Sequence, residues 1–89
     1  MLGIFRTTKF KKDFKVITRR NYNIDLLKNV ILLLVKEEEL PMEYKDHPLK
    51  GKYTGYRDCH IENDWVLIYK VKEGVLHLAR TGTHSDLGL

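Results

Sequence analysis

The feature that most constrains the fold is the spacing of three β-type segments in the second half of this 89-residue chain. They cover residues 56–61, 65–71 and 75–81, and the turns between them hold Asn63-Asp64 and Glu73-Gly74. Such short connections leave no room for a crossover helix, so the segments must pair as antiparallel hairpins. The middle segment is apolar at odd and even positions alike, which predicts a central strand covered on both faces.

The start of the chain predicts a short strand over residues 2–6, followed by a helix that Thr7-Thr8 cap. Phe10, Phe14 and Ile17 recur at helical spacing, and Lys or Arg occupies much of the rest of the helix surface. We therefore expect an amphipathic helix with one apolar and one basic side.

A second helix is predicted after Asn23, a suitable N-cap. Residues 26–40 are apolar on more than one side, so we expect this helix to be largely buried and to end where Pro41 stops it. Three glutamates at 37–39 would then lie near its C-terminus, where they oppose the helix dipole.

The order of elements is therefore β-α-α-β-β-β. We expect an α+β fold in which the two N-terminal helices pack on one face of a mainly antiparallel sheet of about four strands. Residues 42–55 form a long polar connection of the kind that often carries function, and residues 83–89 have room for one helical turn. The length predicts one domain, residues 1–89.

Composition excludes several classes of protein. The longest apolar run, residues 30–35, is far shorter than the roughly 18 to 20 residues of a membrane-spanning helix. Lysines and arginines interrupt the N-terminus too early for a signal peptide. Cys59 is the only cysteine, so neither an internal disulfide nor a paired-cysteine zinc site is possible. We expect a cytoplasmic protein that does not enter membranes.

Positive charge is concentrated at the N-terminus. The first 20 residues hold seven of the 16 Lys and Arg and a single acid, Asp13. Those on the predicted first helix are Lys9, Lys11, Lys12, Lys15, Arg19 and Arg20. Such a cationic face attracts a polyphosphate without recognising its sequence, although a solvated helix face that keeps a small protein soluble has the same composition.

Residues suited to acid-base chemistry fall in the second half of the chain. In an antiparallel meander the end of one strand lies beside the start of the next, which places His60, Asp64 and Arg80 at one edge of the sheet. His84 is close enough in sequence to reach that edge, and His47 reaches it only if the long connection folds back. Imidazoles exchange protons near neutral pH and arginine holds phosphate, so a phosphodiester is the substrate we infer.

Each of these residues also has a structural interpretation. A His60–Asp64 pair could be a turn hydrogen bond, Trp65 could be a core residue, and Arg80 could pair with an acid. His77 alternates with apolar neighbours, and we take it as structural. The histidines lack the spacing of a metal site, so no metal is expected. From these residues alone, a nuclease is one candidate among several.

Three strings together resemble the YafQ-type toxins of the RelE superfamily of bacterial toxin-antitoxin systems: YKDHPLKG at 44–51, YRDCHIENDWVLIYK at 56–70 and RTGTHSDL at 80–87. The resemblance implies a RelE-like fold and a ribosome-dependent mRNA endonuclease that uses no metal and no cofactor. It also implies an antitoxin, encoded beside the toxin, through which alone the protein would meet operator DNA.

The resemblance also implies roles for individual residues. The catalytic set would be His47, His60, Asp64, Arg80 and His84. Within it, we expect His84 to be the general acid, His47 or Asp64 to be the general base, and Arg80 to stabilise the scissile phosphate. Trp65, Lys50, Lys52 and Arg57 would bind substrate, with Trp65 either stacking on a base or supporting the cleft. The six cations of the first helix would contact ribosomal RNA.

One departure from the family pattern concerns the tail. Close relatives tend to carry an aromatic residue just after the final histidine, whereas this chain ends Leu87-Gly88-Leu89, so we do not expect the tail to stack on a base. Two alternatives to a nuclease stay open. One is a non-catalytic member of the superfamily that inhibits gyrase, and the other is an RNA-binding module that uses Lys50-Gly51-Lys52-Tyr53.

Overall fold

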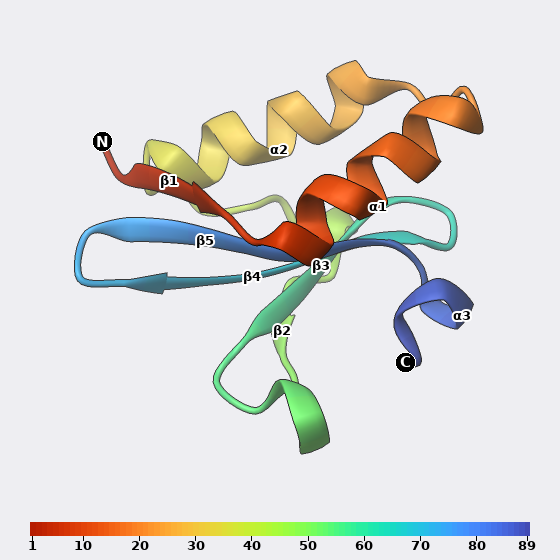
Figure 1. Ribbon diagram of the computed structural model, residues 1–89. Helices are drawn as coiled ribbons and strands as arrows, with labels where there is room; N and C mark the ends of the chain where they lie inside the picture. Colours follow the sequence, from red (N-terminus) through yellow and green to blue (C-terminus); the bar gives the residue numbers. More distant parts are fainter.

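The computed structural model describes residues 1–89, and its chain forms one five-stranded sheet with helices on both faces (Figure 1). The helices and strands are β1 (Gly3–Arg6), α1 (Thr8–Arg19), α2 (Ile24–Val35), β2 (His47–Pro48), β3 (Arg57–Glu62), β4 (Trp65–Lys72), β5 (Val75–Thr83) and α3 (His84–Leu87). Two short 3₁₀ turns, η1 (Met42–Tyr44) and η2 (Gly51–Tyr53), lie in the long connection. Helices α1 and α2 cover one face, and α3 lies on the other.

The predicted α+β class and the antiparallel meander of β3, β4 and β5 are confirmed. The sheet has five strands rather than about four, in the order β1-β5-β4-β3-β2. The additional strand is β2, a two-residue segment of the long connection that pairs antiparallel with β3. At the other edge β1 runs parallel to β5, because the two helices carry the chain away before it returns.

Both helices begin at their predicted caps. The Thr7 hydroxyl accepts the Phe10 amide at 3.0 Å, and the Asn23 side chain accepts the Asp25 amide at 3.1 Å. The predicted end of the second helix is wrong. Helix α2 stops at Val35 because Glu37 takes a left-handed conformation with φ of 59°.

This turn places residues 37–39 beyond the helix. The amides of Glu37 and Glu38 donate back to the carbonyls of Leu34 and Leu33, each at 3.0 Å, which is the pattern of a Schellman motif. The three glutamates therefore belong to a loop and not to the last turn of α2.

The core extends over both faces of β4, as the sequence predicts for a central strand. Trp65, Leu67 and Tyr69 pack beneath α1 and α2, whereas Val66 and Ile68 face the other way. On that second face they meet Ala79, Leu87 of α3 and the loop at residues 49–56. The helix pair thus leaves the second face of the sheet to a short helix and a loop.

Two further findings concern the sequence-based expectations. No helix combines the length and the apolar character that crossing a membrane requires. Cys59 is a free thiol buried beneath the helices, and burial raises its pKa.

Candidate active site

The second face of the sheet carries a row of aligned residues that crosses four strands, and three of its four members are polar. His47 of β2 lies opposite Asp58 of β3, Asp58 lies opposite Ile68 of β4, and Ile68 lies opposite Arg80 of β5. Directly opposed residues of antiparallel strands point to the same face. The backbone positions of Asp58 and Arg80 are therefore about 10 Å apart, which is two strand spacings.

A second row, one step along the strands, adds His60, which lies opposite Val66. Helix α3 then brings His84 over the same face, with its ring centroid 5.2 Å from that of His60. The short strand β2 is what folds the long connection back far enough to place His47 here. The structure therefore brings together all three predicted histidines.

His84 is held by Asp64 from the turn between β3 and β4. The Asp64 carboxylate contacts Nδ1 of the His84 ring and also accepts the His84 backbone amide at 3.2 Å. These hydrogen bonds lower the pKa of Asp64, so it is ionised at neutral pH. An ionised carboxylate can only accept, so Nδ1 carries the hydrogen and Nε2 of His84 is left free.

His47 has a similar arrangement. Its Nδ1 donates to the Lys45 carbonyl at 2.7 Å, which leaves Nε2 as the free ring nitrogen. Oδ1 of Asp58 lies 3.1 Å from the same Nδ1, within ion-pair distance once the ring is protonated. The two free Nε2 atoms are the groups that could exchange protons with a substrate.

Asp58 is a functional candidate that the sequence interpretation missed. Its side chain is 2% exposed, and its Oδ1 atom accepts no hydrogen bond of good geometry. Burial raises the pKa of Asp58, and the charges of the three histidines His47, His60 and His84 oppose that rise. The signal was available in the sequence, because Asp58 and His60 are two residues apart in one strand and so share a face.

Arg80 lies at the β5 end of the first row, and its guanidinium is paired with Asp13 of α1. Arg80 Nε donates to Asp13 Oδ2 at 2.7 Å, and Arg80 Nη2 donates to Oδ1 at 3.0 Å. These hydrogen bonds raise the pKa of Arg80. The pair leaves Nη1 of Arg80 without a partner on Asp13.

Two predicted substrate-binding residues lie on the other face of the sheet. Trp65 is 3% exposed, packs against Tyr22 and donates to the Thr81 hydroxyl at 2.8 Å, so its ring has no face open to a base. The indole therefore supports the sheet from the core side. Arg57 lies with Tyr69 on the helix side of the sheet. It is the neighbour of Asp58 in β3, and adjacent side chains of a strand point to opposite faces.

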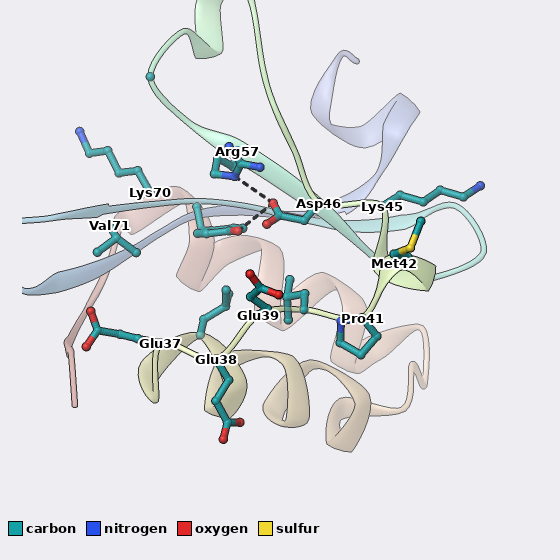
Figure 2. A pocket seen from close by; sticks show the side chains of 14 residues that line it. Glu37, Glu38, Glu39, Pro41, Met42, Lys45, Asp46, Arg57, Lys70 and Val71 are labelled. Carbon is teal, nitrogen blue, oxygen red and sulfur yellow. Dashed lines mark hydrogen bonds and ion pairs between the residues drawn. The ribbon is translucent and has the colours of Figure 1, made fainter.

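Figure 2 shows Arg57 turned toward Asp46 beside a hollow of about 770 Å³. Arg57 donates to Asp46 at 3.1 Å, and the Tyr69 hydroxyl donates to the same oxygen at 2.8 Å. The glutamate loop after α2 lines this hollow, and none of the three histidines does. The hollow is therefore separate from the histidine cluster.

The predicted lysines of the long connection lie on the loop that covers the second face. Lys50 precedes η2 and is exposed, whereas Lys52 lies over the Tyr53 ring at 5.3 Å. The Lys52 amine also lies against Gly88, since a Cβ on that glycine would approach it to 2.9 Å. Lys52 thus joins the loop to the end of α3, close to the histidine cluster.

The predicted RNA-docking cations all lie exposed on α1 or at its C-cap. Five of them, Lys9, Lys11, Lys12, Lys15 and Arg19, form no ion pair. Arg20 differs, because it binds Asp86 of α3 through two hydrogen bonds of 2.7 and 3.1 Å. Asp86 completes the capping box of α3 with Thr83, so this pair anchors the helix that carries His84.

No group of three His, Cys, Asp or Glu side chains is arranged to hold a metal ion. The second face offers three imidazoles, two of them with a free Nε2 atom, together with two carboxylates and an arginine. Such groups can transfer protons at a phosphodiester and offset its negative charge.

The fold and this cluster define a small α+β protein with residues suited to acid-base chemistry gathered on one face of its sheet. Residues 2–88 match the model of a family described as bacterial toxin of type II toxin-antitoxin system, YafQ. The chain belongs to this YafQ family, as the sequence motifs predict.

Individual relatives agree with this assignment. The mRNA interferase toxin YafQ of Escherichia coli strain K12 is 45% identical over 80 residues, which cover 89% of this chain and 87% of the relative. The crystal structure of the E. coli DinJ-YafQ complex contains a chain with 42% identity and a TM-score of 0.90, with 98% of each chain covered. A metal-bound toxin from Helicobacter pylori has 42% identity and a TM-score of 0.91, with 98% of this chain and 99% of that one covered.

Proposed function

We propose that this protein is a ribosome-dependent mRNA endonuclease whose reaction uses its own side chains and no metal ion. The observation that carries the proposal is the cluster of His47, His60 and His84 with Asp58 and Asp64 on one sheet face, in line with Arg80. Its E. coli relative is named an mRNA interferase toxin, which supports an activity directed at mRNA.

Cleavage of RNA without metal requires three things of the protein. A base takes the proton of the 2′-hydroxyl, which attacks phosphorus, and an acid gives a proton to the departing 5′-oxygen. A cation offsets the extra negative charge of the phosphorane between these two steps. The attack breaks one P–O bond as it forms another, so no co-reactant is needed.

We assign the general acid to His84, because Asp64 holds its Nδ1 and backbone amide and so orients the ring with Nε2 free. His47 is then the better of the two expected bases, since Asp64 is already committed to His84. Asp58 lies within reach to stabilise His47 once it is protonated. His60 positions substrate between them, and Arg80 offers Nη1 to the scissile phosphate.

Ribosome dependence is supported by the separation of docking and chemistry. The unpaired cations of α1 lie on the helix side of the sheet, and the histidines lie on the other face. Such a cationic face suits ribosomal RNA, because backbone phosphates can be bound without reading sequence. An isolated mRNA would lack that second attachment, so the ribosome is required for productive binding.

We further propose that a cognate antitoxin neutralises this protein, as the DinJ-YafQ complex of the E. coli relative suggests. Contact with operator DNA would occur only through that complex. The whole chain, residues 1–89, would act as one toxin domain, and its work on ribosomes places it in the cytoplasm.

Single-turnover cleavage of mRNA on programmed ribosomes tests the proposal. His84→Ala should lower the rate by roughly 10²- to 10⁴-fold while ribosome binding stays close to wild type. His77→Ala is the matched control, because this histidine of β5 packs on Phe5 with ring centroids 5.5 Å apart and takes no part in the site. Circular dichroism should show both variants folded.

Two results would refute the proposed chemistry. A wild-type protein that binds ribosomes but cleaves nothing would be a non-catalytic relative, either an RNA-binding module or a gyrase inhibitor. Wild-type cleavage by His84→Ala would place the general acid elsewhere, at His47 or His60.

A further inference from the structure

The only acid in the first 20 residues is directed at the active-site arginine. Asp13 lies in the middle of α1, between Lys12 and the half-buried Phe14. Its carboxylate receives both hydrogen bonds from Arg80 described above and also accepts the Thr81 amide at 3.2 Å. The two side chains are 14% and 20% exposed, so water competes little for the pair.

The topology of the sheet explains why an acid is needed at this point. Strand β1 pairs with β5 only as far as Arg6 opposite Leu78, after which Thr7 turns the chain into α1. Beyond that point the outer edge of β5 has no strand beside it. There the Asp13 carboxylate accepts the hydrogen bond of the Thr81 amide. In a longer sheet, a carbonyl of a neighbouring strand would accept this hydrogen bond.

The pairing also fixes how Arg80 is presented. Nε and Nη2 lie on one edge of the planar guanidinium, and Asp13 occupies both in a side-on arrangement. The plane of the group is thereby set, and Asp13 leaves the remaining edge, with Nη1, turned away from it, where Tyr53 of the covering loop lies near the guanidinium. A long, flexible side chain is held in one orientation before any substrate binds.

We propose that Asp13 is a positioning residue that orients Arg80 toward the scissile phosphate. This inference rests on the proposed nuclease function and names one further residue that the reaction requires. Helix α1 would then have two functions: its exposed cations bind RNA, and its Asp13 orients the arginine of the active site.

An acid at this place works against RNA docking, since it lies among cations that attract phosphate. Its removal changes the formal net charge from +4 to +5 and should strengthen ribosome binding. If Asp13 were only a surface charge, its removal would leave the cleavage step unchanged. If it positions Arg80, docking and cleavage should change in opposite directions.

The test measures ribosome affinity and single-turnover cleavage at saturating toxin for Asp13→Asn and Asp13→Ala. Asp13→Asn keeps the size of the side chain but loses one acceptor, so it preserves folding if Asp13→Ala does not. We expect cleavage to fall roughly 10- to 100-fold, with affinity equal to or tighter than wild type. Glu38→Gln, an exposed acid of the loop after α2, is the control with the same change of charge and should cleave at the wild-type rate.

A double-mutant cycle tests whether Asp13 acts through Arg80. Asp13→Asn should cause no further loss in an Arg80→Ala background, because the group it orients is gone. In the free protein, the Arg80 Nε–H signal in ¹H–¹⁵N spectra should exchange slowly with water in wild type and fast in Asp13→Asn. This measurement does not depend on nuclease activity.

The outcomes separate the two proposals. A wild-type protein without cleavage on ribosomes would overturn the nuclease function and with it the role of Asp13. Wild-type cleavage together with an unchanged rate in Asp13→Asn would overturn the positioning role alone. If Asp13→Asn lowers the cleavage rate by the same factor in the wild-type and the Arg80→Ala backgrounds, the positioning role is also overturned.

Discussion

The clearest separation of docking from chemistry comes from the double substitution Lys11→Ala and Lys12→Ala. Both lysines are exposed on α1 and neither forms an ion pair, so the change removes charge and leaves the core intact. We expect weaker binding to ribosomes and a shallower dependence of that binding on salt. Single-turnover cleavage at saturating toxin should stay close to wild type, because the histidine cluster lies on the other face of the sheet.

The magnitude follows from counterion release. Each phosphate contact steepens the plot of log affinity against log salt by about 0.7 on a single strand and about 0.9 on a duplex. Two lost contacts therefore flatten the slope by about 1.4 to 1.8. Between about 50 and 200 mM salt, wild-type affinity should fall by a factor roughly 7 to 12 times larger than that of the variant.

A salt-titrated binding assay on programmed ribosomes measures both slopes. The matched control is Lys36→Ala with Lys72→Ala, which removes the same charge from exposed sites at the end of α2 and the end of β4. Equal slopes for the two double variants would show that net charge alone governs binding, and the assignment of α1 as the docking face would be refuted.

Three further predictions concern the buried acid, metal and the antitoxin. Burial raises the pKa of Asp58, so the folded protein binds this proton more tightly than the unfolded chain, and stability is lost as pH rises from about 3.9 through the raised value. Asp58→Asn should therefore have a higher melting temperature than wild type at pH 7, and this difference should shrink toward pH 4. Its cleavage rate should fall roughly 10-fold. A melting temperature below that of wild type at pH 7 would contradict the stability argument. Chelation of divalent ions should leave cleavage unchanged on washed ribosomes that polyamine keeps assembled, and activity restored only by added metal would overturn the metal-free mechanism. Expression of the chain alone should arrest growth, and co-expression of the cognate antitoxin encoded beside it should restore growth. Healthy growth with abundant soluble toxin would contradict a toxin function.

Much of the fold could be predicted because it depends on contacts that are close in sequence. Two-residue turns force the β3-β4-β5 meander, and the caps at Thr7 and Asn23 fix where the helices begin. The apolar run of β4 correctly indicated a strand covered on both faces. The end of α2 was the exception, since a left-handed glutamate ended the helix where no glycine or proline marks it.

For the candidate site, the sequence by itself determined which residue types are present and which of them share a strand face. The family motifs selected His47, His60, Asp64 and His84, and the structure places these four close together. Alternation along β3 also links Asp58 to His60, although only its burial makes that acid prominent.

Tertiary structure alone decided how distant segments meet. Pairing of β2 with β3 brings His47 to the cluster, and the early end of β1 opens the edge where Asp13 reaches Arg80, 67 residues away in the chain. The same packing buries Trp65 on the helix side, away from the face that carries the histidines. Local patterns give the phase of a strand, but the face that helices cover and the partner that a charge finds depend on how the whole chain packs.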